Sequence, residues 1–118
     1  MKFLLVFLGG GLGSMARYAL AMGFQSLDTR LPWATLVANA LAACLIGVFY
    51  GLDFKLTQTA WWMLGAVGFC GGLSTFSTFG LETVQLYQQG HTAYALLNVV
   101  LSVLLGIGLV YLCVKLFS

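Results

Sequence analysis

One segment of the sequence, residues 68–80, combines groups that can bind ions without carrying a full charge. Its adjacent glycines weaken a helix, and the hydroxyl groups that follow compete for the backbone carbonyls. Carbonyl oxygens that are set free inside a membrane are suited to coordinating a cation. The segment therefore predicts a helix broken at about Gly71 to Thr75, with four hydroxyl residues at or beyond the break: Ser74, Thr75, Ser77 and Thr78.

Two phenylalanines, Phe76 and Phe79, lie just beyond the expected break and share one helix face. An aromatic ring has a negative face and a positive edge, so rings turned edge-on to a path can attract a small anion. The neighbouring hydroxyl groups are hydrogen-bond donors that an anion can use. The alternative is a kinked helix in which the rings are core and the hydroxyls bond to the preceding turn.

Two apolar runs elsewhere each carry a polar stripe at a spacing of four residues, which places each stripe on one helix face. Close helix packing alone would explain a single stripe of small and polar residues. Two stripes that both include an asparagine fit a water- or ion-lined path better. The stripes are Thr35, Asn39, Ala43 and Gly47 in one run and Asn98, Ser102 and Gly106 in the other.

The composition places these residues in a membrane. Of the 118 residues, 61% are hydrophobic and 7% are charged, whereas about 25% of a soluble domain is charged. This composition excludes a nucleic-acid-binding protein, a disordered chain and a secreted disulfide scaffold. The cysteines are widely separated and the only histidine is His91, so we expect neither a metal cage nor an enzyme.

Four windows are long and apolar enough to cross a bilayer, which takes about 20 residues each: 3–24, 33–52, 61–87 and 92–117. Few residues remain outside them. We therefore expect a single domain, 1–118, that is an all-α integral membrane protein with four transmembrane helices and a break in the third. The glycines between Gly9 and Gly13 predict close helix packing.

The basic residues are almost evenly divided between the two sides of this expected bundle. Lys2, Lys55 and Lys115 fall on one side, and Arg17 and Arg30 fall on the other. Because an excess of Lys and Arg sets orientation, this near balance predicts dual topology and an antiparallel homodimer. The alternative is that the count is too small to be informative and that Arg17, inside the first window, does not contribute.

Three segments taken together, 9–18, 35–39 and 68–79, closely resemble the Fluc (CrcB) family of fluoride channels. The resemblance covers the whole chain in length, number of spans and order of motifs. It implies a fluoride-selective channel in the lipid bilayer of a microbial inner (plasma) membrane, where passive export of fluoride relieves its toxicity. It also implies two pores per antiparallel homodimer and a structural sodium ion that is not transported.

The resemblance also implies roles for individual residues. Asn39 matches the pore asparagine, and Phe76 and Phe79 match the two pore phenylalanines. Gly71 and Ser74 fall where backbone carbonyls bind sodium. The other residues with implied roles are Thr35, Ser77 and Thr78 as pore hydroxyls, Ser102 in the polar track of the fourth span, Arg17 as an anion-attracting or structural group, and Glu82, whose role is open. Some relatives have tyrosine and serine in place of Asn98 and Gly106, so the ends of that track stay open.

Two other functions fit part of the pattern. A small multidrug transporter has the same size, four spans and dual topology, but proton-coupled transport of cationic drugs needs a membrane-buried carboxylate. The first window has no carboxylate, and Glu82 near the end of the third is a poor substitute. A membrane scaffold would use the polar stripes for packing only, and it predicts no ion flux.

Overall fold

The computed structural model describes all 118 residues and contains helices but no strand. The third expected span consists of four consecutive elements, one of which is a π-helix. In chain order the elements are α1 (Lys2–Phe24), α2 (Trp33–Gly51), α3 (Phe54–Thr57), α4 (Thr59–Trp61), the π-helix η1 (Trp62–Cys70), α5 (Gly71–Leu73), α6 (Phe76–Gln88) and α7 (Thr92–Phe117).

Four helical stretches are long and apolar enough to cross a membrane: Lys2–Phe24, Trp33–Gly51, Thr59–Gln88 and Thr92–Phe117. Their bounds differ from the four windows expected from the sequence by no more than two residues at either end. The expectation of an all-helical, multi-pass membrane protein is therefore confirmed.

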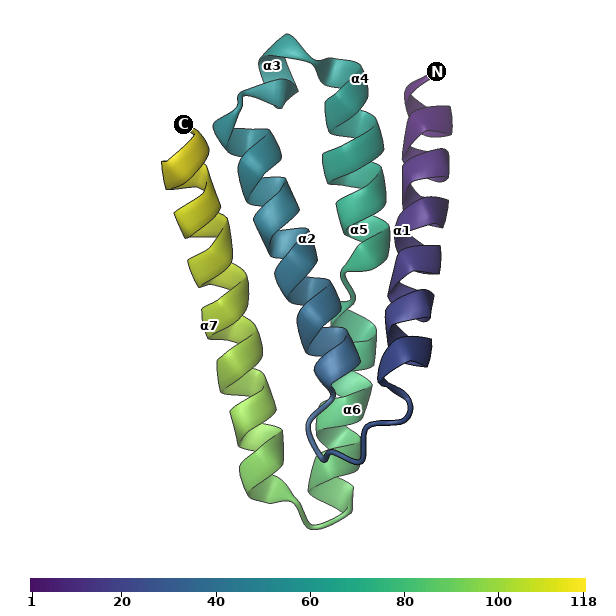
Figure 1. Ribbon diagram of the computed structural model, residues 1–118, viewed down its shortest axis with the longest axis vertical. Coiled ribbons are helices and arrows are strands. Elements are labelled where there is room, and N and C mark those ends of the chain that lie inside the picture. Colours follow the sequence, from purple (N-terminus) through teal and green to yellow (C-terminus); the bar gives the residue numbers. More distant parts are fainter.

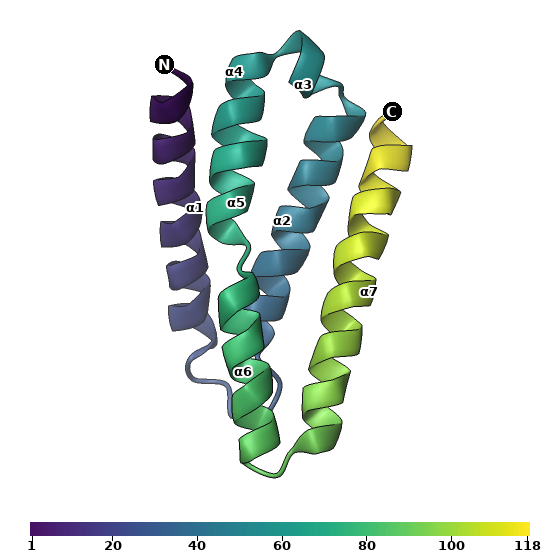
Figure 2. The same ribbon diagram turned by 180° about the vertical axis from the view of Figure 1, so that it is seen from behind.

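The four stretches run side by side along the long axis of the molecule, with both termini at the same end (Figure 1). The main helix contacts are those of α1 with η1 and α5 and of α2 with α7. The view from behind shows α6 continuing beyond α5 toward the opposite end, where a short turn joins it to α7 (Figure 2). A small core of Ala38, Ala42, Cys70 and Leu73 lies where α2 meets η1 and α5.

Helix α1 packs against η1 and α5 with almost no space between the backbones. A Cβ atom added to Gly9 would overlap the carbonyl oxygen of Leu64, and one added to Gly13 would overlap that of Phe69. On the opposite side, a Cβ atom on Gly72 would overlap the carbonyl oxygen of Gly10. The close packing predicted for the glycines of the first span is thus confirmed at Gly9 and Gly13, but not at Gly11, where an added Cβ atom meets nothing within 4 Å.

The backbone is extended at Ser74 and Thr75, between α5 and α6. Ser74 has φ −76° and ψ 154°, and Thr75 has φ −151° and ψ 122°. The interruption was predicted at Gly71 to Thr75, but residues 71–73 are helical. The glycine at position 72 is explained by its close contact with α1, which leaves no room for a side chain, and not by an unwound backbone. We call Ser74 and Thr75 the extended segment.

The tight contact of α1 predicts a large difference between two substitutions on the same helix. Gly13→Ala would force the Phe69 carbonyl away and cost about 1–3 kcal/mol of stability. Gly11→Ala is the matched control, because a Cβ atom there meets nothing within 4 Å. Thermal unfolding of the purified protein in detergent should show a lower Tm for Gly13→Ala only. Equal Tm values for both variants would contradict the backbone contact.

Candidate functional site

The side chain of Asn39, on α2, holds the extended segment by two hydrogen bonds to one residue. The Thr75 N–H donates to Asn39 Oδ1 at 2.7 Å, and Asn39 Nδ2 donates to the Thr75 carbonyl at 3.2 Å. In a bilayer no water replaces the helical bonds that such a segment gives up, so the amide takes their place. A primary amide has two N–H donors, and one of those on Nδ2 remains for another partner.

The extended segment removes the helical donors from the carbonyl groups of the turn before it. In a continuous helix the Gly71 carbonyl would accept from Thr75 N–H, and the Ser74 carbonyl from Thr78 N–H. Those donors bond instead to Asn39 Oδ1 and, at 3.2 Å, to Thr75 Oγ1. The Gly72 carbonyl accepts a bond from Arg17 Nε at 3.1 Å. The carbonyls of Gly71 and Ser74 have therefore lost their helical donors, whereas that of Gly72 has a replacement.

Four of the residues expected at a pore, Asn39, Phe76, Phe79 and Ser102, line one small pocket of about 280 Å³, here called the polar pocket. The rings of Phe76 and Phe79 lie side by side in it, with centroids 5.5 Å apart and planes inclined by 46°. The hydroxyl groups of Ser74 and Ser102 form no hydrogen bond within the chain. The pocket is lined by Asn39, Ser74, Thr75, Phe76, Phe79, Ser102 and Val103.

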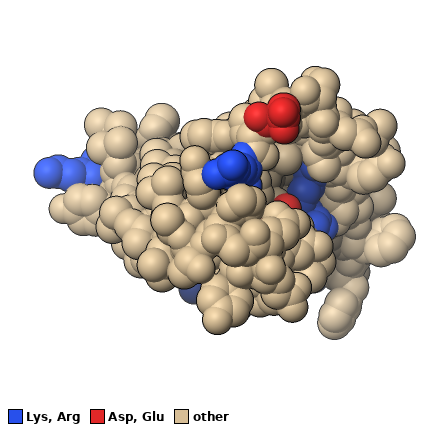
Figure 3. Space-filling model, turned by 90° about the horizontal axis from the view of Figure 1, so that it is seen from below, with Lys and Arg blue, Asp and Glu red and all other residues tan.

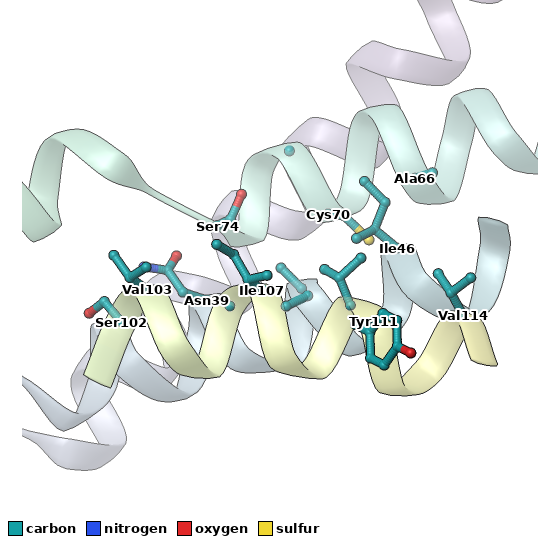
Figure 4. Close-up of a pocket in the computed structure, with 15 residues that line it drawn as sticks. Asn39, Ile46, Ala66, Cys70, Ser74, Ser102, Val103, Ile107, Tyr111 and Val114 are labelled. Carbon is teal, nitrogen blue, oxygen red and sulfur yellow. The ribbon is translucent and has the colours of Figure 1, made fainter. Parts of the chain in front are cut away.

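The polar pocket adjoins a longer groove of about 750 Å³ between α2, η1, α5 and α7. Figure 4 shows that Asn39 of α2, Ser74 of the extended segment and Ser102 of α7 come together at one end of this groove. Toward the other end, the walls are apolar side chains such as Ile46 and Val114. Gly71 also lines the groove. We call it the long groove.

A third hollow, of about 250 Å³, contains the two charged residues singled out in the sequence, Arg17 and Glu82, and we call it the charged hollow. The hydroxyl of Thr35 donates to Glu82 Oε1 at 2.8 Å, while Oε2 is buried without a partner. Thr75 and Thr78 line the same hollow. Viewed from the end at which α6 meets α7, acidic and basic atoms lie close together in a recess (Figure 3).

Three residues have positions that the sequence analysis did not anticipate. Thr75 caps α6, because its Oγ1 accepts the Thr78 N–H and lies 3.2 Å from Thr78 Oγ1. A threonine immediately before a helix is a typical N-cap, and this signal was present in the sequence. Ser77 is exposed and lines none of the three cavities described above. Asn98 is buried against Thr83 rather than in the polar pocket.

The fold and the site define a small multi-pass membrane protein in which neutral polar groups of α2, α7 and the interrupted third span meet in one pocket. The family model described as CrcB-like protein, Camphor Resistance (CrcB), matches residues 4–114. The chain therefore belongs to the CrcB family, which confirms the resemblance found in the sequence.

Three relatives from Salmonella also support membership of this family. The relatives from Salmonella arizonae, Salmonella paratyphi B and Salmonella newport are each 44% identical to this chain over 117 residues, which is 98% of this chain and 92% of each relative. All three are named "Fluoride-specific ion channel FluC". The family is one of channels and not of enzymes, as the sequence analysis expected.

The hydrogen bonds of Asn39 predict that its side chain stabilises the folded protein. Asn39→Ala leaves an N–H and a carbonyl of Thr75 without partners, at a cost of about 1–3 kcal/mol. Ser102→Ala is the control, because the Ser102 hydroxyl has no partner within the chain. Thermal unfolding in detergent should show a lower Tm for Asn39→Ala than for Ser102→Ala. The opposite order would mean that Asn39 does not hold the extended segment.

Proposed function

We propose that this protein is a fluoride-selective channel that lets fluoride leave a microbial cell passively through the inner (plasma) membrane and so relieves its toxicity. The observation that carries the proposal is the polar pocket, in which every group able to bind an anion is neutral. These groups are the spare N–H of Asn39, the hydroxyls of Ser74 and Ser102, and the ring edges of Phe76 and Phe79. The name of the relatives, fluoride-specific ion channel, supports fluoride as the ion.

Neutral donors suit fluoride because a channel must replace the water around an ion and still release it. A fixed cation at this depth would bind the anion strongly and slow its exit. Hydroxyl and amide donors take the place of water one at a time, and the positive ring edges extend the path without adding a charge. Ser102 continues the path along α7, since its hydroxyl is free.

The charged hollow acts as the entrance to this path, and Thr75 lines both cavities. Arg17 gives the hollow a positive charge that attracts anions, although its Nε–H is engaged with the Gly72 carbonyl. Thr78 offers a hydroxyl hydrogen, because in its bond with Thr75 it is the acceptor. The hydroxyl hydrogen of Thr35 is already given to Glu82, so Thr35 contributes to the path only when that bond opens.

The channel works as an antiparallel homodimer with two pores. A single chain leaves the polar pocket without a complete wall, since Phe76 at its margin is 84% exposed. The long groove is equally open along its length and mostly apolar, which suits the helix of a second copy. The near balance of basic residues between the two sides of the bundle favours insertion in both orientations.

A structural sodium ion is held in this dimer by the carbonyl oxygens of Gly71 and Ser74. The donor set fits, because oxygen ligands are what hard cations prefer, and both carbonyls have lost their helical donors. Both residues also line the long groove, the face proposed to meet the second copy. The carbonyl oxygens coordinate the ion, which thereby links the two chains and does not move with fluoride.

The function is tested by ion release from liposomes that contain the purified protein. Liposomes loaded with potassium fluoride or potassium chloride receive valinomycin, which carries potassium, and anion-selective electrodes record the release. The wild type should release fluoride and retain chloride. Phe79→Ile should reduce fluoride release at least about tenfold, because it removes the ring edge from the path while keeping an apolar side chain. Retention of both anions by folded wild-type dimer would overturn the proposed function.

The sodium site predicts a dependence of flux on the cation present. Protein equilibrated with N-methyl-D-glucamine in place of sodium should conduct less fluoride, because the carbonyls of Gly71 and Ser74 then have no cation to coordinate. Restoring sodium should restore the flux. Fluoride release that is the same with both cations, from protein shown to be free of sodium, would refute this site.

A further inference from the structure

Helix α6 carries both phenylalanines of the polar pocket, yet few apolar contacts hold it in place. Helix α7 is the only element against which α6 packs extensively. Leu86 is the only residue of α6 that is buried. The position of Phe76 and Phe79 therefore depends on the polar bonds that tie α6 to its neighbours.

Three such ties exist. Two of them come from α2 and have been described above: Asn39 binds Thr75 just before α6, and Thr35 binds Glu82. The third comes from α7, where Asn98 Nδ2 donates to Thr83 Oγ1 at 3.0 Å. Thr83 Oγ1 in turn donates to the carbonyl oxygen of Phe79 at 2.8 Å. A continuous chain of hydrogen bonds thus runs from α7 to the backbone of a pocket phenylalanine.

Asn98 is placed in a way that stability alone does not explain. It is 1% exposed, and it is the largest fully buried side chain of the molecule. Its Oδ1 is buried without a hydrogen-bond partner, an arrangement that costs free energy. An apolar side chain of similar size would avoid that cost. The amide is therefore present for the bond that its Nδ2 makes with Thr83.

The spacing of the fourth-span stripe had placed Asn98 in the same polar track as Ser102. In the structure Ser102 lines the polar pocket, whereas Asn98 lines neither that pocket nor the long groove. One turn of helix is enough to move a side chain from the pocket to the contact between α7 and α6. Asn98 therefore acts on the pocket through Thr83 and not by touching an ion within it.

We propose that Asn98 and Thr83 are positioning residues that set the orientation of Phe79 in the pore. Asn98 fixes the hydroxyl of Thr83 so that it bonds to the Phe79 carbonyl, and a threonine hydroxyl bonded to the carbonyl four residues earlier bends a helix locally. That bend directs the Phe79 ring toward the polar pocket. The inference rests on the proposed function, because it concerns the path that fluoride takes.

The test compares four variants in the liposome assay over a range of fluoride concentrations: Thr83→Val, Thr83→Ser, Asn98→Leu and the double variant Asn98→Leu/Thr83→Val. Valine has the shape of threonine without the hydroxyl, so Thr83→Val should lower the maximal flux about fivefold to tenfold, the effect of one lost hydrogen bond. Thr83→Ser keeps the hydroxyl and should conduct like the wild type. Since both residues act through one chain of bonds, the double variant should conduct no less than Asn98→Leu alone.

Size-exclusion chromatography shows whether each variant is folded and assembled. If Asn98→Leu fails to assemble, the difference in flux between Thr83→Val and Thr83→Ser is sufficient to test whether the Thr83 hydroxyl positions Phe79. Wild-type flux in Thr83→Val, or losses that multiply in the double variant, would overturn the inference while leaving the channel function intact. A wild type that releases no fluoride would overturn both. Equal losses in Thr83→Val and Thr83→Ser would show that keeping the hydroxyl does not preserve the flux, which also refutes the proposal.

Discussion

The candidate site depends on one constraint: the third span must satisfy its backbone polar groups where its helix is interrupted inside the membrane. Hydrocarbon provides no partner for them, so the protein does. Asn39 takes both polar groups of Thr75, and Arg17 takes the carbonyl of Gly72. Among the groups that remain are the ones proposed to bind ions: a spare N–H of Asn39 for an anion, and the carbonyls of Gly71 and Ser74 for a cation.

The close packing of α1 makes this arrangement possible. Arg17 reaches the Gly72 carbonyl because Gly72 lets the two backbones approach until a Cβ atom no longer fits between them. Beside this contact α5 is helical up to Leu73, and the extended backbone is limited to Ser74 and Thr75. The contact at Gly72 therefore lies directly beside Gly71 and Ser74, the residues whose carbonyls are proposed to bind a cation.

Most of the architecture could be predicted from the sequence, because hydropathy and helix length define membrane spans directly. The motifs around Asn39 and Phe76 also identified the family. Periodicity was less informative about hydrogen-bond partners. It placed Asn98 on the helix face of Ser102, but in the structure Asn98 is buried against Thr83 of α6. The adjacent glycines suggested unwinding at Gly71, since sequence does not reveal that α1 presses against this turn. Dimer, sodium and pore remain predictions.

The central claim is that neutral donors held around an interrupted span pass fluoride and exclude chloride. The most direct measurement is the reversal potential of the purified protein in a planar bilayer, with potassium fluoride on one side and potassium chloride at equal concentration on the other. Equal potassium on both sides removes any contribution from that cation. The account predicts a large reversal potential, of the sign set by fluoride crossing alone. A reversal potential near zero in a conducting bilayer would contradict it.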